Sequence, residues 1–353
     1  MLWRSQRLVP ALPAWNLSPT TSGPFARNHI DTPNVNIASQ ASPCKCADAS
    51  RPSMSVISWP LQCFSEIDMR LVTFEKNGTA RLGLAEGLEV ADLSGSDSTP
   101  ASLLALLAAG DEGLAAARKA AISAPRYPLD ELKLLPVLPR PGKIICLGLN
   151  YAAHAAEGGR EKPDYPNFFM RCATSLLGHQ IPIVRPRVST QLDFEAELAA
   201  IIGREVPRHV AREEALTFVA GYACFNDVSV RDYQRRTPQW TIGKNFDATG
   251  PFGPAFVTAD ELPAGAAGLK IESRLNGEVM QSANTRDMIF PVDETIALLS
   301  ECMTLEVGDV LVMGTPAGVG FARTPPLWMK EGDTIEVEIE GVGLLSNPIV
   351  NEI

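Results

Sequence analysis

The sequence predicts an α+β protein that is mainly β. From Met69 onward, short runs alternate polar and apolar residues, which is the period of a strand with one buried face. Helical periodicity is confined to a few segments, chiefly residues 101–122 and 291–302. The final runs, residues 333–340 and 342–350, alternate cleanly, and we expect them to close a sheet.

The bulk composition limits the class of protein. A chain of 353 residues with 45% apolar and 20% charged residues can bury one large core or two modest ones. The net charge of −10 argues against a nucleic-acid partner, and no apolar run approaches the length of a membrane span. Seven cysteines without a C-x-x-C pair indicate reduced thiols in a reducing compartment.

Residues 1–68 do not have the pattern of a folded domain. They are rich in Pro, Ser, Thr and Asn, and we expect a disordered leader. The first thirty residues contain Arg4, Arg7 and Arg27 but no acid, which is typical of an organellar transit peptide. Alternatively, the start is over-extended, because residues 69–74 open like the first strand of a domain. We favour this second interpretation and a cytoplasmic protein; a true transit peptide would make it mitochondrial.

Residues 69–137 are predicted to form a small N-terminal domain. Asn77-Gly78 lies between two alternating runs and is a strong hairpin signal. Residues 101–122 read as a helix in two pieces, broken at Gly110-Asp111. Frequent prolines over residues 125–141 indicate a linker, so the main domain is predicted to span residues 138–353.

Residues 192–203 contain the most informative pattern of the chain. Asp193, Glu195 and Glu197 alternate with apolar residues, so a strand here would place all three carboxylates on one face. Burying such a cluster requires a compensating cation, and a hard divalent ion with oxygen ligands would serve. An exposed acidic edge is the alternative, and this stretch by itself leaves both open.

His154 and Glu157 are three residues apart in a segment that reads as a short helix, so they share one face. A carboxylate beside an imidazole orients it and raises its basicity, as a water-activating base requires. An ordinary pair on the surface is the alternative. Gly158 and Gly159 indicate that this segment is mobile.

Six stretches resemble the fumarylacetoacetate hydrolase family, in the family's order and over residues 140–353. They are GLNYAAH (148–154), FMRCATSL (169–176), DFEAEL (193–198), NDVSVRDYQ (226–234), GKNF (243–246) and GTPAGVG (314–320). The resemblance implies a mixed β-sandwich roll with few helices, preceded by a small N-terminal domain. It also implies a homodimer.

The resemblance further implies the site residues. The Mg²⁺ (or Mn²⁺) ligands would be Glu195, Glu197 and Asp227. The catalytic groups would be His154, Glu157, Lys244 and Gln234, with the first two on a lid. Substrate would contact Arg171 and Thr315, although Arg171 stands where many members have lysine, which leaves the distal part of the substrate open.

The function implied is a Mg²⁺-dependent hydrolase that cleaves a C–C bond in an acylpyruvate-like or 2,4-diketo acid, in the catabolism of aromatic compounds. The ion would stabilise an enolate leaving group. Lyase or isomerase chemistry of the same family is the first alternative, either decarboxylation of an oxaloacetate-like acid or ketonisation of a 2-hydroxymuconate-like dienol. An idle metal-binding scaffold is the second, and we expect the hydrolase.

Overall fold

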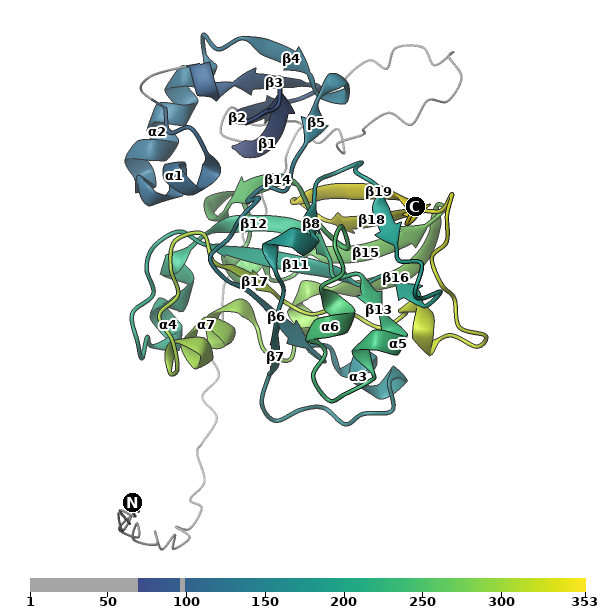
Figure 1. Ribbon diagram of the computed structural model, residues 1–353. Coiled ribbons are helices and arrows are strands. Elements are labelled where there is room, and N and C mark those ends of the chain that lie inside the picture. Colours follow the sequence, from purple (N-terminus) through teal and green to yellow (C-terminus); the bar gives the residue numbers. More distant parts are fainter. Residues whose placement is uncertain (1–68, 96–98) are drawn as a thin grey trace, which may run out of the picture. The chain divides into compact units, whose positions relative to one another are not determined.

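The computed structural model describes residues 69–95 and 99–353, so the predicted leader lies outside the described residues (Figure 1). The described chain is mainly β, with mixed parallel and antiparallel sheets and few helices, which confirms the predicted fold class. No helix in these two ranges is long and apolar enough to cross a membrane.

A sheet of 12 strands contains most of the chain, along the path β4-β3-β2-β1-β14-β12-β11-β17-β6-β7. Its strands are β1 (Arg70–Lys76), β2 (Thr79–Glu86), β3 (Glu89–Asp92), β4 (Arg126–Pro128), β5 (Lys133–Leu134), β6 (Ile144–Gly148), β7 (Asn167–Met170), β8 (Leu176–Leu177), β11 (Ala196–Ile202), β12 (Val219–Asn226), β14 (Gly250–Thr258) and β17 (Val310–Val312). A five-stranded sheet follows the order β16 (Glu278–Asn284), β15 (Lys270–Leu275), β18 (Thr334–Ile339), β19 (Gly343–Asn351) and β9 (Ile183–Arg185).

The N-terminal elements follow the predicted turns. Asn77 and Gly78 both adopt positive φ angles, 53° and 74°, in the turn between β1 and β2, which confirms the hairpin. The predicted two-piece helix is α1 (Leu103–Ala108) and α2 (Gly110–Ala121), and Gly110 makes the break with φ of 59°. β1 also pairs with β14, so one sheet runs through both predicted domains. The boundary near residue 137 stays a prediction.

β11 is an inner strand of the larger sheet, between β12 and β17, and is buried on both faces. Leu198 and Ala200 belong to a core that includes the five-stranded sheet and α7 (Val292–Ser300). Ala199 and Ile201 belong to a second core, which includes residues of α1 and α2. This double burial explains the continuous apolar run after the acids of this segment.

The acidic segment is not one strand, which corrects the sequence interpretation. It divides into β10 (Leu192–Asp193), which pairs with β13 (Ser229–Val230), and β11, which pairs with β12. The chain changes partners between the two, and Asn226 Oδ1 accepts a hydrogen bond from the Glu195 backbone N–H at the crossing. The strict alternation of faces is therefore lost, and Asp193 does not share a face with Glu195 and Glu197.

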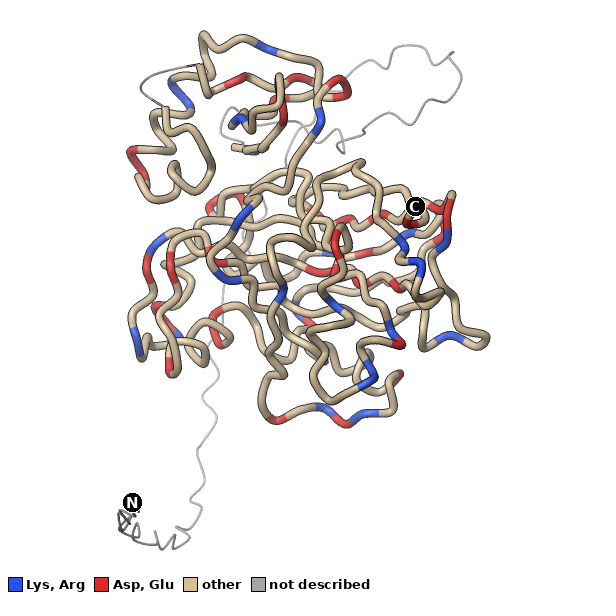
Figure 2. Tube along the Cα trace, in the orientation of Figure 1, with Lys and Arg blue, Asp and Glu red and all other residues tan. Residues whose placement is uncertain are grey.

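Four short helices complete the main part of the chain: α3 (Ala152–Glu157), α4 (Arg212–Ala215), α5 (Arg231–Gln234) and α6 (Thr241–Lys244). The predicted helix over residues 291–302 is α7, which begins after Pro291. Figure 2 shows acidic and basic residues interspersed along the trace rather than separated by sign.

Stability should depend on pH through His179, which is buried and accepts the Ser346 backbone N–H at Nδ1. Burial lowers the pKa of this imidazole from 6.5 to about 4. The unfolded chain therefore binds the proton more tightly, so stability falls as the pH drops below 6.5. Between pH 7 and pH 5 we expect this histidine alone to remove about 2 kcal/mol from the free energy of unfolding.

Urea unfolding at both pH values checks this expectation. His179→Asn keeps an acceptor at the Nδ1 position and should flatten the pH dependence. His209→Asn, at an exposed position with positive φ that asparagine tolerates, is the matched control. Equal pH slopes for wild type and His179→Asn would contradict the assignment.

Candidate active site

A cavity of about 320 Å³ lies where the three helices α3, α5 and α6 meet the ends of the central strands. Most of the residues expected at the active site line it: His154, Glu195, Glu197, Gln234, Lys244 and Thr315. The remaining lining residues are Leu147, Gly148, Leu149, Gly158, Arg160, Phe169, Arg231, Arg235, Trp240 and Phe321. The acids are buried and form the floor, whereas Arg160 and Arg235 are exposed and lie at the mouth.

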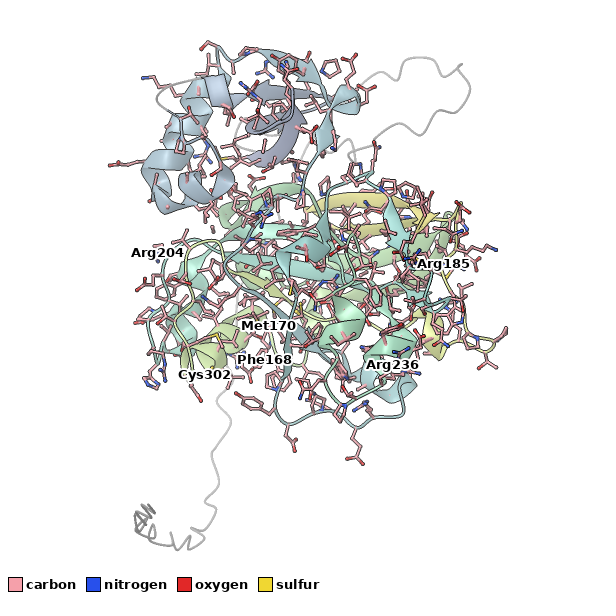
Figure 3. The ribbon with its side chains drawn as sticks, viewed as in Figure 1. Phe168, Met170, Arg185, Arg204, Arg236 and Cys302 are labelled. Atoms are coloured by element: carbon pink, nitrogen blue, oxygen red, sulfur yellow. The ribbon has the colours of Figure 1, made fainter. Side chains whose placement is uncertain are left out.

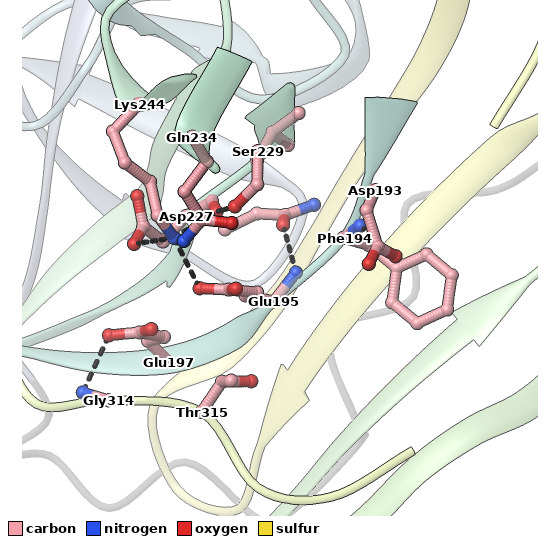
Figure 4. A network of polar contacts seen from close by, with 12 residues as sticks. Asp193, Phe194, Glu195, Glu197, Asp227, Ser229, Gln234, Lys244, Gly314 and Thr315 are labelled. Atoms are coloured by element: carbon pink, nitrogen blue, oxygen red, sulfur yellow. Dashed lines mark hydrogen bonds and ion pairs between the residues drawn. The ribbon is translucent and has the colours of Figure 1, made fainter. Parts of the chain in front are cut away.

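Three carboxylates meet beside the cavity; Glu195 and Glu197 line it, whereas Asp227 does not. Glu195 precedes β11, Glu197 lies within it, and Asp227 directly follows β12. One carboxylate oxygen from each lies within 4.8 Å of the others, and all three side chains are buried. The pairing of β11 with β12 produces this convergence, because Ala196 lies opposite Asn226. Figure 4 shows the three acids together, with Lys244 directed at two of them.

Two cations compensate Glu195. Lys244 Nζ lies 2.6 Å from both Glu195 Oε2 and Asp227 Oδ2. Arg231 Nη1 lies 2.6 Å from Glu195 Oε1. Burial by itself would raise the pKa of Glu195, but attraction to Lys244 and then to Arg231 outweighs it and holds this pKa well below its usual range. Glu195 is therefore an ionised carboxylate.

Glu197 has a different environment. Its Oε2 accepts one hydrogen bond, 2.6 Å long, from the Gly314 backbone N–H. Burial raises the pKa of Glu197 well above its usual range, and repulsion by Asp227 and Glu195 raises it further. Charge on Glu197 is thus under-compensated by the described protein groups, and an added cation at the three acids would relieve the repulsion.

Asp193 lies outside this cluster (Figure 4). Its carboxylate accepts from the backbone N–H groups of Gly320 and Phe321, at 2.7 and 3.0 Å, and pairs with Arg231 Nε at 2.8 Å. This acid therefore fastens the loop after residue 314 to α5. These contacts give Asp193 an indirect, supporting position in the site.

His154 and Glu157 form a hydrogen-bonded pair on α3, with 2.7 Å between Nδ1 and Oε1. The other Glu157 oxygen accepts the Gly318 backbone N–H at 2.8 Å, which ties α3 to the glycine-rich loop. Because Nδ1 is engaged, Nε2 is the ring nitrogen that remains for chemistry in the cavity.

Arg171 is placed differently from the expectation. It is buried, does not line the cavity, and donates to Asp227 Oδ1, to the Val228 carbonyl, and to the hydroxyls of Ser175 and Thr249. The guanidinium thus supports a floor acid from behind, which argues against the predicted direct contact with substrate. The planar guanidinium of arginine can donate to several acceptors in different directions, whereas the single ammonium of a lysine could not contact all of them.

Gln234 and Thr315 line the cavity, and hydrogen bonds to neighbouring protein groups hold both side chains. Gln234 Oε1 accepts from Arg231 Nη1 at 3.0 Å, so its amide NH₂ group is left for a ligand. The Thr315 hydroxyl donates to the Ala196 carbonyl and accepts from Gln281 Nε2. Both side chains are held by protein contacts.

Sequence reasoning missed four lining residues: Arg160, Arg235, Trp240 and Phe321. Their positions are set by loops, and no periodic pattern marks them. The sequence did contain one indirect signal for Trp240, namely Gly148, which lies in the first stretch that resembles the family. A Cβ at Gly148 would lie 2.0 Å from Trp240 Cζ3, so only glycine lets the indole form this wall.

The donor set suits a hard divalent cation. It consists of carboxylate oxygens alone, which Mg²⁺ and Mn²⁺ prefer, and it lacks the thiolates or imidazole clusters of softer metals. The under-compensated charge on Glu197 is a second observation in favour. Glu195, Glu197 and Asp227 therefore fit a divalent metal.

Removing the Lys244 ammonium should destabilise the protein when divalent ions are absent. Lys244→Met leaves Glu195 and Asp227 buried without their shared cation, and we expect a loss of about 3–5 kcal/mol in the free energy of unfolding in EDTA. Mg²⁺ should restore more stability to this variant than to wild type. Urea unfolding with and without Mg²⁺ measures both effects, with the exposed Lys133→Met as control. Unchanged stability of Lys244→Met in EDTA would contradict the assigned role.

Comparison with known proteins places this geometry in a family. The family model described as fumarylacetoacetate (FAA) hydrolase C-terminal matches residues 143–350. Oxaloacetate tautomerase FAHD2A, mitochondrial, of Homo sapiens is 40% identical over 300 residues, or 83% of this chain and 94% of that protein. Oxaloacetate tautomerase YisK of Bacillus subtilis (strain 168) is 41% identical over 266 residues, which cover 72% of this chain and 88% of that protein.

Solved structures agree. Fumarylacetoacetate hydrolase from psychrophilic Exiguobacterium antarcticum superposes with a TM-score of 0.70 and 37% identity, covering 80% of this chain and 100% of that chain. Maleylpyruvate hydrolase from Sphingobium sp. SYK-6, in complex with manganese(II) ion and pyruvate, superposes with a TM-score of 0.68 and 33% identity. The match covers 81% of this chain and 100% of that chain. The chain belongs to the fumarylacetoacetate hydrolase family and is similar to enzymes of several activities within it.

Proposed function

We propose that the protein is a metal-assisted keto–enol tautomerase of a small 2-oxo acid of the oxaloacetate type. The observation that carries this proposal is one cavity lined by Glu195, Glu197 and His154. Asp227 completes the cluster of buried carboxylates, and Glu157 is hydrogen-bonded to His154. The names of the relatives support it, since the proteins from Homo sapiens and Bacillus subtilis are oxaloacetate tautomerases. The isomerase alternative considered from the sequence is therefore preferred over the hydrolase.

We propose that Glu195, Glu197 and Asp227 hold Mg²⁺ or Mn²⁺. When bound, such an ion acts as a Lewis acid that favours negative charge on the oxygens of a 2-oxo acid. Lys244 and Arg231 keep Glu195 ionised, and Arg171 forms a buried ion pair with Asp227. The floor is thus prepared electrostatically before substrate enters.

Proton transfer is assigned to His154. In the keto-to-enol direction, Nε2 takes a proton from carbon 3, the C–H electrons form the double bond between carbons 2 and 3, and the electrons of the carbonyl π bond move to the oxygen on carbon 2. That oxygen then takes the proton from Nε2, which returns the imidazole to its starting state. No water is consumed and no carbon–carbon bond breaks. Glu157, fixed by the Gly318 N–H, orients the ring and stabilises its charged form.

Lys244 and Gln234 present donors to the same cavity. We infer that the ammonium and the amide stabilise charge that develops on the substrate oxygen during proton transfer. We propose that Thr315, which lines the cavity, contacts the carboxylate of the 2-oxo acid. Its hydroxyl would have to turn its proton from the Ala196 carbonyl to the substrate.

Hydrolysis of an acylpyruvate is the second candidate. The same His154–Glu157 pair that removes a proton from carbon can remove one from water. Similarity to the maleylpyruvate hydrolase from Sphingobium sp. SYK-6 favours this activity. The two candidates differ in whether water reaches the substrate.

A direct assay separates the candidates. We expect the purified protein with Mg²⁺ to accelerate the loss of enol absorbance from oxaloacetate, without pyruvate release, and to lose this activity in EDTA. Acetylpyruvate and fumarylpyruvate should be cleaved slowly. Fast cleavage of either with inert oxaloacetate would establish the hydrolase, whereas pyruvate release from oxaloacetate would indicate decarboxylation.

A variant of the proposed base tests the mechanism. His154→Ala should retain Mg²⁺ binding while kcat for tautomerisation falls by about 10²–10⁴, the range typical of a lost acid–base group. His209→Ala, at an exposed position, is the control. Normal turnover by His154→Ala would remove this residue from the mechanism.

We propose a mitochondrial location, which was the alternative drawn from the sequence. The relatives named mitochondrial support it, together with the basic, acid-free composition of residues 1–30. Fusing residues 1–68 to a fluorescent reporter tests it, and a diffuse cytosolic signal would favour the over-extended start.

Assembly as a homodimer is also a proposal. β7 is an end strand of the larger sheet, and the exposed apolar side chains Tyr165 and Met170 lie in and beside it. Such an edge is more stable when it is covered. Light scattering should give twice the chain mass of 38.0 kDa, and a monomer mass would contradict the proposal.

A further inference from the structure

Two arginines at the cavity mouth have no assigned partner. Arg160 follows α3 and Arg235 follows α5, and both line the cavity. Among the described residues, neither takes part in an ion pair, whereas the inner cations Lys244 and Arg231 each contact carboxylates. The mouth therefore carries two positive charges with which no carboxylate of the described residues forms an ion pair.

Phe321 positions one of these arginines. The Arg235 guanidinium carbon lies 4.2 Å from the centre of the Phe321 ring, and that of Arg231 lies 4.5 Å from the same centre. The Phe321 backbone N–H is held by the buried Asp193, so the ring is a fixed support. Arg235 is thus directed along the cavity wall although its side chain is exposed.

The arrangement is electrostatically incomplete. Burial lowers the pKa of Arg235, repulsion by Arg231 lowers it further, attraction to Asp193 offsets part of the decrease, and Arg160 adds a smaller repulsion. In addition, Arg231 Nη2 is buried without a hydrogen-bond partner among the described residues. Buried donors are normally paired, so an unpaired one that lines a cavity indicates a missing acceptor. An anion between floor and mouth would relieve both features.

We propose that Arg235, with Arg160, binds the far carboxylate of a dicarboxylic 2-oxo acid and so selects dianionic substrates. This inference rests on the proposed function and names its substrate class. The 2-oxo acid end of the substrate occupies the acidic floor, and the second carboxylate faces the arginines at the mouth. A planar guanidinium donates two parallel hydrogen bonds to a carboxylate, which gives direction as well as charge.

An uncharged tail fits this mouth less well. An apolar acyl group would leave Arg160 and Arg235 without a counter-charge and would displace water from them. A 2-oxo acid that ends in a methyl group is therefore expected to bind more weakly than one of equal length that ends in a carboxylate.

Kinetics of two substrates test the proposal. Oxaloacetate and 2-oxobutanoate have the same carbon chain and differ in a terminal carboxylate or methyl group. For Arg235→Gln we expect KM for oxaloacetate to rise about tenfold, with kcat changed little, because one charge-assisted contact is lost at a partly exposed site. Exchange of the carbon-3 hydrogens of 2-oxobutanoate with D₂O, followed by NMR, should be unchanged.

Two further variants sharpen the test. Arg235→Lys keeps the charge and should recover part of the affinity. Arg236→Gln is the matched control, since Arg236 is exposed, lies over the Tyr233 ring and does not line the cavity (Figure 3). Added salt should raise KM for oxaloacetate more in wild type than in Arg235→Gln.

Equal KM values for oxaloacetate in wild type, Arg235→Gln and Arg236→Gln would overturn the inference. It would also be overturned if Arg235→Gln slowed 2-oxobutanoate exchange as much as oxaloacetate turnover, since that pattern indicates a general structural role. A wild-type protein that enolises neither compound would instead overturn the proposed function, and this inference with it.

Discussion

Mutual repulsion among three buried carboxylates is the constraint on which the rest of the site depends. Glu195, Glu197 and Asp227 converge on one point because β11 and β12 pair side by side. Placing them there is unfavourable unless cations lie nearby. Lys244 and Arg231 supply part of that charge at 2.6 Å, and Arg171 supplies more from behind Asp227. The divalent ion proposed at these acids would supply the remainder.

Other features follow from holding these cations in place. Arg231 must reach Glu195, and Asp193 anchors it while it also fastens the loop at Gly320 and Phe321. The same loop provides the Gly314 N–H for Glu197 and, through Gly318, the N–H for Glu157. One loop therefore connects the acidic floor, the proton-transfer pair and the aromatic support of the mouth.

Local signals in the sequence were sufficient to predict turns and helix breaks. The Asn77-Gly78 turn and the break at Gly110 follow from backbone preferences of single residues, and both were predicted. The three floor acids were identified from a strand pattern together with the family resemblance. The alternating pattern drew attention to Glu195 and Glu197, whereas Asp227 came from the family resemblance alone, because its approach depends on the pairing of β11 with β12.

Features that depend on distant partners were not predicted. The division between β10 and β11 arises because the chain leaves β13 and joins β12, and no local property of residues 192–203 reports that change. Arg171 was assigned to substrate because it occupies a position where many family members have lysine, but the structure buries it against Asp227, Ser175 and Thr249. Arg235 lines the cavity mouth in contact with Phe321, which is far along the chain, and no local pattern reports that contact.

The most direct measurement of this account is anomalous diffraction from a crystal soaked in Mn²⁺. The account predicts one strong anomalous peak bounded by oxygens of Glu195, Glu197 and Asp227, and loss of that peak in Glu197→Gln. A wild-type crystal with full Mn²⁺ occupancy elsewhere and no peak at these three acids would contradict it.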